Sequence, residues 1–307
     1  MSAEHRHDHA AGASSTRLLL AFLVTAVILV AEVVGAIITG SLALLVDAGH
    51  MLTDAGGLLI ALTAARLMAR PPSERRTWGF ARAEVLGAGA QATVLLGVGI
   101  YAIVEGVQRL LSSEPGEVTG GLLLVFGVVG LLGNIVAMLI LAGGRDSNLN
   151  LRAAFLEVVA DALGSVAVIV SAVLIQTQGW VKADAIAGLL IALLIIPRAV
   201  SILREAGSVL LESVPPGLDL AEVRDHILEV DHVVDVHDLH ASRIGTGTPV
   251  LTAHVVVEEG CFRDGHAPQM LDALQACVAD HFDVSVDHST FQLEPPRHTE
   301  HEHSHHP

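Results

Sequence analysis

The stretch Asp47-Ala-Gly-His-Met-Leu-Thr-Asp54 lies inside a long apolar segment and contains the only histidine of the apolar part of the chain. Asp54 follows His50 by four residues, so on a helix the two side chains lie on one face, one turn apart. A second pair with the same spacing, Glu157 and Asp161, lies in a later apolar segment. Two such pairs on two apolar helices can place four nitrogen and oxygen ligands around one divalent cation. We therefore predict a metal site formed by these four side chains.

Apolar residues dominate the chain up to about residue 206 and become sparser after it. Hydrophobic residues make up 52% of the 307 residues and charged residues only 16%, and the mean hydropathy is +0.59. Six apolar segments are each close to or longer than the roughly 20 residues that a helix needs to cross about 30 Å of hydrocarbon. We predict six transmembrane helices, at residues 17–39, 43–68, 83–111, 118–142, 153–177 and 183–204.

The rest of the chain has the composition of a soluble α/β domain. Pro215-Pro216-Gly217 marks the boundary. The patterns that follow predict a helix, two strands, a helix and a last strand, an order typical of a small open-faced sheet with helices on one side. These elements are expected at 219–230, 233–244, 250–258, 266–282 and 284–293. The expected domains are a disordered histidine-containing tail at 1–16, a six-helix domain at 17–206, a soluble domain at 207–295 and a histidine-rich tail at 296–307.

The charge pattern narrows the class of protein and its orientation. A formal net charge of −16 argues against nucleic acid as a partner. The two cysteines, Cys261 and Cys277, have no metal-binding spacing and are expected to be reduced cytosolic thiols. No cleavable signal peptide is expected, because the first apolar run is long enough to span a membrane. Arginines gather in the loops after the second and fourth apolar segments and near the end of the sixth, so the positive-inside rule places both termini in the cytoplasm.

Acidic residues inside the apolar segments indicate a path for cations. An ionisable side chain at the bilayer centre costs about 2.5–3.5 kcal/mol on insertion scales. The sequence shows almost no basic residue at a matching depth, so cations or protons are needed to neutralise the acids. Glu84, Glu105 and Asp184 are interpreted as interfacial or structural, and Glu32 as a hydrogen-bonding partner within the bundle. Asp47 either orients His50 as a hydrogen-bond acceptor or caps the second helix, and the cap is slightly favoured.

The type of ligand suggests the metal. One imidazole and three carboxylates can form the tetrahedral site that Zn²⁺ prefers. Co²⁺ and Cd²⁺ stay open as alternatives, because the order of affinities alone does not select the metal. The absence of cysteine and methionine ligands argues against Cu⁺.

Five stretches of the chain resemble the cation diffusion facilitator family, in particular its bacterial zinc, cobalt and cadmium exporting branch. The resemblance covers about residues 17–295, and the stretches occur in the family's order. They are Asp47–Asp54, Trp78-Gly-Phe-Ala-Arg-Ala-Glu84, Ala154-Phe-Leu-Glu-Val-Val-Ala-Asp-Ala-Leu-Gly-Ser165, Val236-His-Asp-Leu-His240 and His288-Ser-Thr-Phe-Gln-Leu-Glu294.

This resemblance implies six transmembrane helices, a cytosolic ferredoxin-like C-terminal domain, a homodimer and metal export coupled to proton entry. We expect a protein of the bacterial inner membrane with Zn²⁺ as substrate, and as a regulatory ion, and with no prosthetic group. The family's transport pair on the second helix falls on His50 and Asp54. On the fifth helix, Glu157 stands where the family commonly has histidine, and Asp161 matches.

The resemblance also implies metal binding in the soluble domain. Members of the family bind metal through histidines on the sheet near the dimer interface. His237, His254 and His288 fall on these positions, and His240 lies close to His237. The loop between the second and third helices carries Glu74 and no histidine, so the further metal site that some relatives have there is not expected.

The sequence leaves several alternative functions open. Within the family, the alternative is a broader exporter of Co²⁺, Cd²⁺, Ni²⁺ or Mn²⁺. A membrane metal sensor without transport would bind metal in the soluble domain but give no flux, and a carrier of organic cations would show flux with which Zn²⁺ competes. A membrane metalloenzyme would need a motif such as HExxH, which the sequence lacks, so no enzyme activity is expected.

Overall fold

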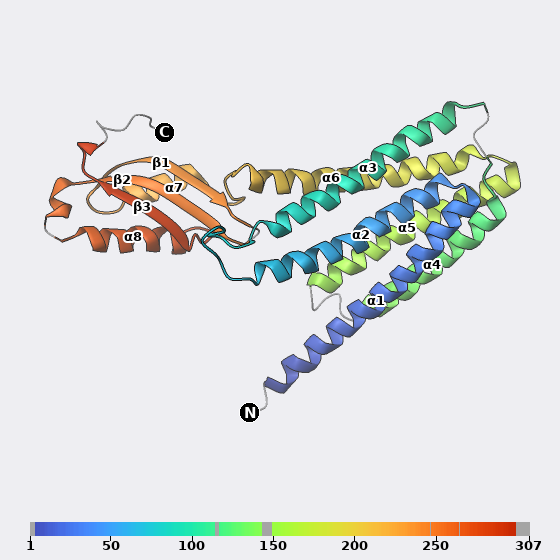
Figure 1. The fold of residues 1–307 in the computed structure, drawn as a ribbon, viewed down its shortest axis with the longest axis horizontal. Coiled ribbons are helices and arrows are strands. Elements are labelled where there is room, and N and C mark those ends of the chain that lie inside the picture. The colour runs from blue at the N-terminus through green and yellow to red at the C-terminus, as the bar shows by residue number, and fades with distance from the viewer. Residues whose placement is uncertain (1–3, 114–116, 143–148, 246, 264, 299–307) are drawn as a thin grey trace. The chain divides into compact units, whose positions relative to one another are not determined.

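The structure is a computed structural model that describes residues 4–113, 117–142, 149–245, 247–263 and 265–298. Six long helices come first, and a mixed α/β region follows (Figure 1). All six are long and apolar enough to cross a membrane, so the predicted transmembrane helices are confirmed and the chain is an integral membrane protein. They are α1 Glu4–Thr39, α2 Leu42–Met68, α3 Ala83–Leu111, α4 Gly120–Ala142, α5 Leu149–Gln178 and α6 Lys182–Leu210.

The start of α1 and the end of α6 differ most from the sequence prediction. Residues 1–16 were expected to be disordered, but α1 is helical from Glu4 onward, because this alanine-containing stretch has no proline to stop a helix that has already nucleated. Residues 1–3 lie outside the described residues. α6 continues through Pro197 and ends at Leu210 instead of at residue 204, so Arg198 lies well inside this helix and not at its end.

The chain divides into two compact units, and one of the divisions falls after Leu203, near the boundary expected at residue 206. The first, called the membrane unit, comprises Met1–Leu59 and Ala90–Leu203, and the second, called the C-terminal unit, comprises Ile60–Gly89 and Arg204–Pro307. The loop between α2 and α3 therefore belongs with the soluble domain. Within the C-terminal unit, the Trp78 ring meets the His288 ring edge to face at 4.7 Å.

In the membrane unit, α4 packs closely against α1 and α5 through glycines. A Cβ atom at Gly133 would lie 2.6 Å from Ile28 Cδ1 on α1, and one at Gly127 would lie 3.0 Å from Ile169 Cγ1 on α5. Leucine and valine side chains elsewhere on these helices are exposed, as expected of surfaces that face lipid. Small residues at the contacts let helix backbones approach each other where lipid supplies no hydrophobic drive for association.

The first turn of α2 is held by an acid from another helix. Asp184 of α6 accepts hydrogen bonds from the Ser41 hydroxyl group and from the backbone N–H of Leu42, at 2.6 Å for the latter. Ser41 Oγ accepts the N–H of Leu44 at 3.1 Å. These contacts satisfy N–H groups that a helix N-terminus leaves without partners, so the structural role expected for Asp184 is the one observed. Gly40, at φ 69°, makes the turn that precedes the helix.

In the C-terminal unit, three strands form one sheet in the order β1-β2-β3, with β1 antiparallel and β3 parallel to the central β2. Alternate residues such as Leu251, Ala253 and Val255 pack against helices, with Ile227 and Leu274 in the same core. The helices thus cover one face, which confirms the expected ferredoxin-like α/β fold. The elements are α7 Leu220–Leu228, β1 Val233–Arg243, β2 Pro249–Val257, the 3₁₀ helix η1 Glu259–Phe262, α8 Ala267–Asp280 and β3 His288–Glu294.

Candidate metal sites

Three of the four predicted membrane ligands gather around the ring of His50. Its Nε2 atom lies 3.5 Å from Asp54 Oδ2 on the same helix and 3.8 Å from Asp161 Oδ1 on α5. The His50 and Asp161 side chains are buried, and Asp54 is partly buried. The spacing of four residues on α2 places His50 and Asp54 on one face of the helix, as predicted.

Glu157, the fourth predicted ligand, is bound by Arg198, an arginine that the sequence prediction placed near the end of the sixth helix and used only to orient the chain. Arg198 Nη2 donates to Glu157 Oε1 at 2.6 Å, and Arg198 Nη1 lies 3.9 Å from Asp54 Oδ2. The expectation that these acids have almost no base at their depth is therefore wrong for this pair. Arg198 thus contacts two carboxylates of the predicted site. The sequence prediction missed this contact because it depends on how α5 and α6 pack, which no local pattern shows.

A cavity borders this cluster of charges. It has a volume of about 300 Å³, and Asp54, Glu157 and Asp161 contribute its acidic wall. Mostly apolar side chains of α1, α2, α4 and α5, among them Phe22 and Met51, form the rest. Three carboxylates that share one small cavity can attract and bind a divalent cation together with an imidazole.

Asp47 takes neither of the roles expected for it. α2 begins at Leu42, and its N-terminus is capped by Asp184, so Asp47 lies beyond the first turn and is not a cap. Among the described residues, His50 Nδ1 has no hydrogen-bond partner, so Asp47 does not orient the ring. The Asp47 carboxylate instead lies over α5, where a Cβ atom at Gly164 would be 2.7 Å from Asp47 Oδ1.

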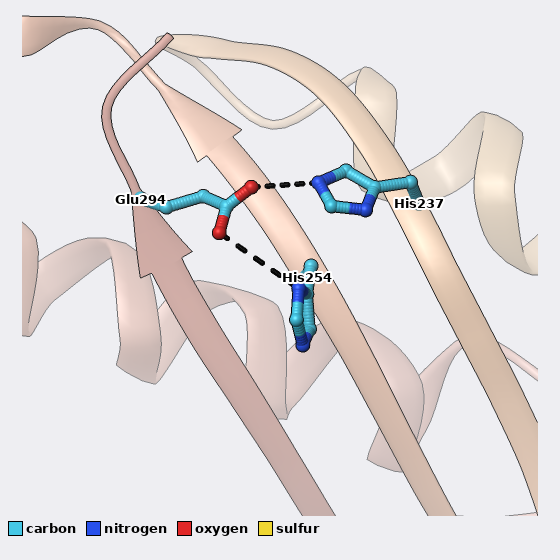
Figure 2. A group of neighbouring side chains, drawn as sticks. All are labelled: His237, His254 and Glu294. Carbon is cyan, nitrogen blue, oxygen red and sulfur yellow. Dashed lines mark hydrogen bonds and ion pairs between the residues drawn. The ribbon is translucent and has the colours of Figure 1, made fainter. Parts of the chain in front are cut away.

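A second cluster forms on the open face of the sheet. His237 Nε2 lies 2.6 Å from Glu294 Oε1, and His254 Nδ1 lies 3.8 Å from Glu294 Oε2 (Figure 2). One ligand atom from each of the three side chains lies within 4.8 Å of the others. The pairing of strands explains this: His237 is opposite His254 in the antiparallel pair, and Glu294 ends the adjacent strand β3. Two imidazoles and a carboxylate are a ligand set that suits Zn²⁺.

Glu294 was not among the predicted ligands, and two of the predicted histidines, His240 and His288, are not part of this cluster. His288 is paired with Val250, four positions along β2 from His254, or about 13 Å at the rise of a strand, so the structure does not bring it to this cluster. His240 is separated from His237 by an irregularity in β1 and lines a hollow of about 340 Å³ beside His254. A buried glutamate at the end of a strand whose neighbours carry histidine is the signal that could have identified Glu294.

Cys261 and Cys277 are both buried, and no disulfide joins them. Burial raises the pKa of the Cys277 thiol, and the negative charge of Glu229 raises this pKa further. Neither thiol belongs to the cluster of His237, His254 and Glu294.

Comparison with known proteins agrees with this architecture. Residues 18–211 match the model of the cation efflux transmembrane domain, and residues 215–296 match that of the cation efflux protein cytoplasmic domain. The metal cation efflux system protein CzcD of Cupriavidus metallidurans is 42% identical over 294 residues, which cover 96% of this chain and 90% of that protein. The zinc transporter ZitB of Escherichia coli is 39% identical over 297 residues, with coverages of 94% and 92%.

The name of a third relative gives the counter-ions in addition to the metals. The cadmium, cobalt and zinc/H⁺-K⁺ antiporter of Bacillus velezensis is 33% identical over 296 residues, which cover 96% of this chain and 93% of that protein. The six membrane-spanning helices match the transmembrane domain of cation efflux proteins, and the α/β region matches their cytoplasmic domain. Together they define a membrane transporter. The chain belongs to the cation efflux family, the cation diffusion facilitators.

Proposed function

We propose that this protein exports divalent metal ions, with Zn²⁺ as its main substrate, and that it exchanges them for protons by alternating access. The observation that carries the proposal is the convergence of His50, Asp54 and Asp161 from two membrane helices beside a cavity with an acidic wall. The names of relatives support the substrate and the counter-ion, because they include zinc, cobalt and cadmium as well as protons.

The chemistry of these side chains supports exchange against protons. An imidazole and carboxylates bind a metal ion only in their deprotonated forms, so binding of the ion releases protons and protonation releases the ion. Glu157 completes the set when its carboxylate turns from Arg198 toward the ion. Movement of α2 and α5 against their neighbours would then open the site to one side of the membrane at a time.

We further propose that the protein is a homodimer in the bacterial inner membrane with both termini in the cytoplasm. In this arrangement His237, His254 and Glu294 form a cytosolic site for a regulatory Zn²⁺ ion. Such an ion would link all three strands of the sheet, because each strand supplies one ligand. The match of residues 215–296 to the cytoplasmic domain of the family supports the location of this site.

The test of the transport site is zinc flux in liposomes that contain the purified protein and carry an imposed proton gradient. The wild-type protein should accumulate ⁶⁵Zn²⁺, and Asp54→Ala and Asp161→Ala should lower the rate to that of empty liposomes. Glu259→Gln, an exposed acid of the C-terminal unit, serves as the control. Transport by both alanine variants at the wild-type rate would refute the assignment of the site.

A further inference from the structure

A second group of buried polar side chains lies in the membrane unit and is not used by the site described above. Glu32 of α1, Asp47 of α2 and Asn134 of α4 are each at most 1% exposed, and so is Ser165 of α5. Among the described residues, Glu32 Oε2, Asp47 Oδ2 and Asn134 Oδ1 have no hydrogen-bond partner. Unpaired polar atoms in a bundle core are costly, so their presence requires an explanation.

Glycines on two helices let these side chains meet. A Cβ atom at Gly130 would lie 2.9 Å from Glu32 Oε1 and 3.1 Å from Ser165 Oγ. Both polar groups therefore occupy the space that the missing side chain of Gly130 leaves beside α4. Asn134 Nδ2 donates to Ser165 Oγ at 3.3 Å. Asp47 lies over Gly164, the residue before Ser165. Four helices therefore bring one polar group each to the same level of the bundle.

This level is close to the candidate transport site. Ser165 follows Asp161 by four residues on α5, and Asp47 precedes His50 by three residues on α2. One helical turn corresponds to about 5.4 Å along the axis. Asp47 and Asp161 also act electrostatically on Glu32. A divalent cation between His50, Asp54 and Asp161 would thus lie about one helical turn from the group of buried polar side chains around Glu32.

Among the described residues, the charged groups that act most strongly on Glu32 are acidic, Asp47 of α2 and Asp161 of α5. α4 contains no titratable residue. On its own helix, Arg17 is the only other charged residue from position 17 onward, and it lies 15 residues away, or about 22 Å. A carboxyl group in such surroundings holds a proton unless a cation neutralises it.

We propose that the Glu32 carboxyl group, surrounded by Asp47, Asn134 and Ser165, binds one of the protons that are exchanged for the metal ion. This inference rests on the proposed function. The charge of a metal ion one turn away favours the ionised carboxylate, so binding of the ion releases the proton to water. Reprotonation of Glu32 weakens the binding of the ion by the same coupling, because linkage between two sites is reciprocal.

Glu32→Gln tests the proposal, because the amide keeps the size of the side chain but cannot exchange a proton. Full-length protein is reconstituted in liposomes, and zinc flux is measured with and without a proton gradient. The variant is expected to lose most of the stimulation by the gradient, and because the amide mimics the protonated acid, its equilibrium binding of ⁶⁵Zn²⁺ in detergent should weaken by about tenfold. The number of protons released per zinc ion bound should fall by about one.

Glu105→Gln is the matched control, since Glu105 is also an acid of a membrane helix. Its Oε1 atom lies 2.8 Å from Arg109 Nε, and it is not part of the group around Glu32. Full coupling in Glu32→Gln would overturn the proposal, and so would complete loss of zinc binding, which would make Glu32 part of the ion site. If Asp54→Ala and Asp161→Ala abolish flux while Glu32→Gln stays coupled, only this inference fails. If those two variants transport normally, the proposed function fails first.

A measurement on the wild-type protein decides the matter even if Glu32→Gln does not fold. Infrared difference spectra of the protein with and without Zn²⁺, with carbon-13 in its glutamate side chains, report the loss of a protonated glutamic acid. The proposal requires such a band to disappear when zinc is added. Its absence from the zinc-free spectrum would overturn the proposal.

Discussion

At the scale of single residues, Arg198 changes the expected chemistry of the transport site the most. Its guanidinium group contacts Glu157 at 2.6 Å and lies 3.9 Å from Asp54, so a metal ion that uses these two carboxylates competes with a tethered cation. Two unit charges 4 Å apart interact by about 4 kcal/mol at an effective dielectric constant of 20. The Arg198 side chain is 42% exposed, so solvent reduces this interaction.

Arg198→Gln should therefore bind Zn²⁺ more tightly than the wild type. We expect a decrease of about tenfold in the dissociation constant, which corresponds to 1.4 kcal/mol. Equilibrium binding of ⁶⁵Zn²⁺ to the purified protein measures it, with Arg204→Gln on the same helix as the control. Weaker binding by Arg198→Gln would show instead that the arginine holds Glu157 in the geometry that binds the ion.

Cys277 provides a prediction about pH. Its raised pKa means that the unfolded chain loses its thiol proton first as the pH rises through the ordinary value of about 8.5. Folding then becomes less favourable until the pH passes the raised pKa, so this contribution to stability is present below pH 8.5 and is lost above it. In a Cys261→Ser background, alkylation by iodoacetamide should rise at a higher pH for the folded protein than for the same protein in urea. Coincident pH profiles would contradict the prediction.

At the scale of secondary-structure elements, local sequence signals predicted the helices and strands themselves, but not the contacts between them. The six membrane helices follow from the length and apolarity of each segment, and the order of strands and helices follows from local patterns. The partners of Asp184 and Glu294 depend on tertiary packing, because one caps a helix 142 residues away in the sequence and the other reaches a histidine 57 residues away. A four-residue spacing placed His50 beside Asp54, whereas the contact of Glu157 with Arg198 depends on how α5 and α6 pack.

The cap on α2 predicts a loss of stability when it is removed. Asp184→Ala leaves the Ser41 hydroxyl group and the N–H of Leu42 without their acceptor, which costs about 1–3 kcal/mol for a buried group. The apparent unfolding temperature in detergent should fall. Thr177→Ala, which removes an exposed hydroxyl bonded to its own helix, should leave it unchanged. Equal unfolding temperatures for the two variants would argue against the cap.

The register of the sheet separates the histidines of the proposed zinc site from His288. Glu294→Gln should abolish tight zinc binding by the cytosolic cluster, because the carboxylate joins His237 and His254. His288→Ala should keep it, because that ring lies against Trp78. Calorimetric zinc titration of full-length Asp54→Ala, in which the transport site is disabled, isolates the cytosolic site. The reverse pattern would restore the assignment that the sequence suggested.

At the scale of the whole molecule, the proposed orientation can be tested directly. The loop residue Glu117 follows α3, and Ser213 follows α6. In a background without Cys261 and Cys277, Glu117→Cys should react with a membrane-impermeant maleimide in intact cells, because an odd number of spans separates it from a cytoplasmic N-terminus. Ser213→Cys should react only after the cells are permeabilised. Labelling in the opposite sense would invert the topology.

The position of Glu294 at the very end of β3 has a consequence for the histidines that follow it. His298 Nε2 already lies 3.8 Å from Glu294 Oε2, and the sequence continues with His301, His303, His305 and His306. A zinc ion that dissociates from the sheet therefore meets imidazoles tethered a few residues away, at an effective concentration that free ligands in the cytosol do not reach. Rebinding should lengthen the residence time of the ion, and removal of the last nine residues should shorten it.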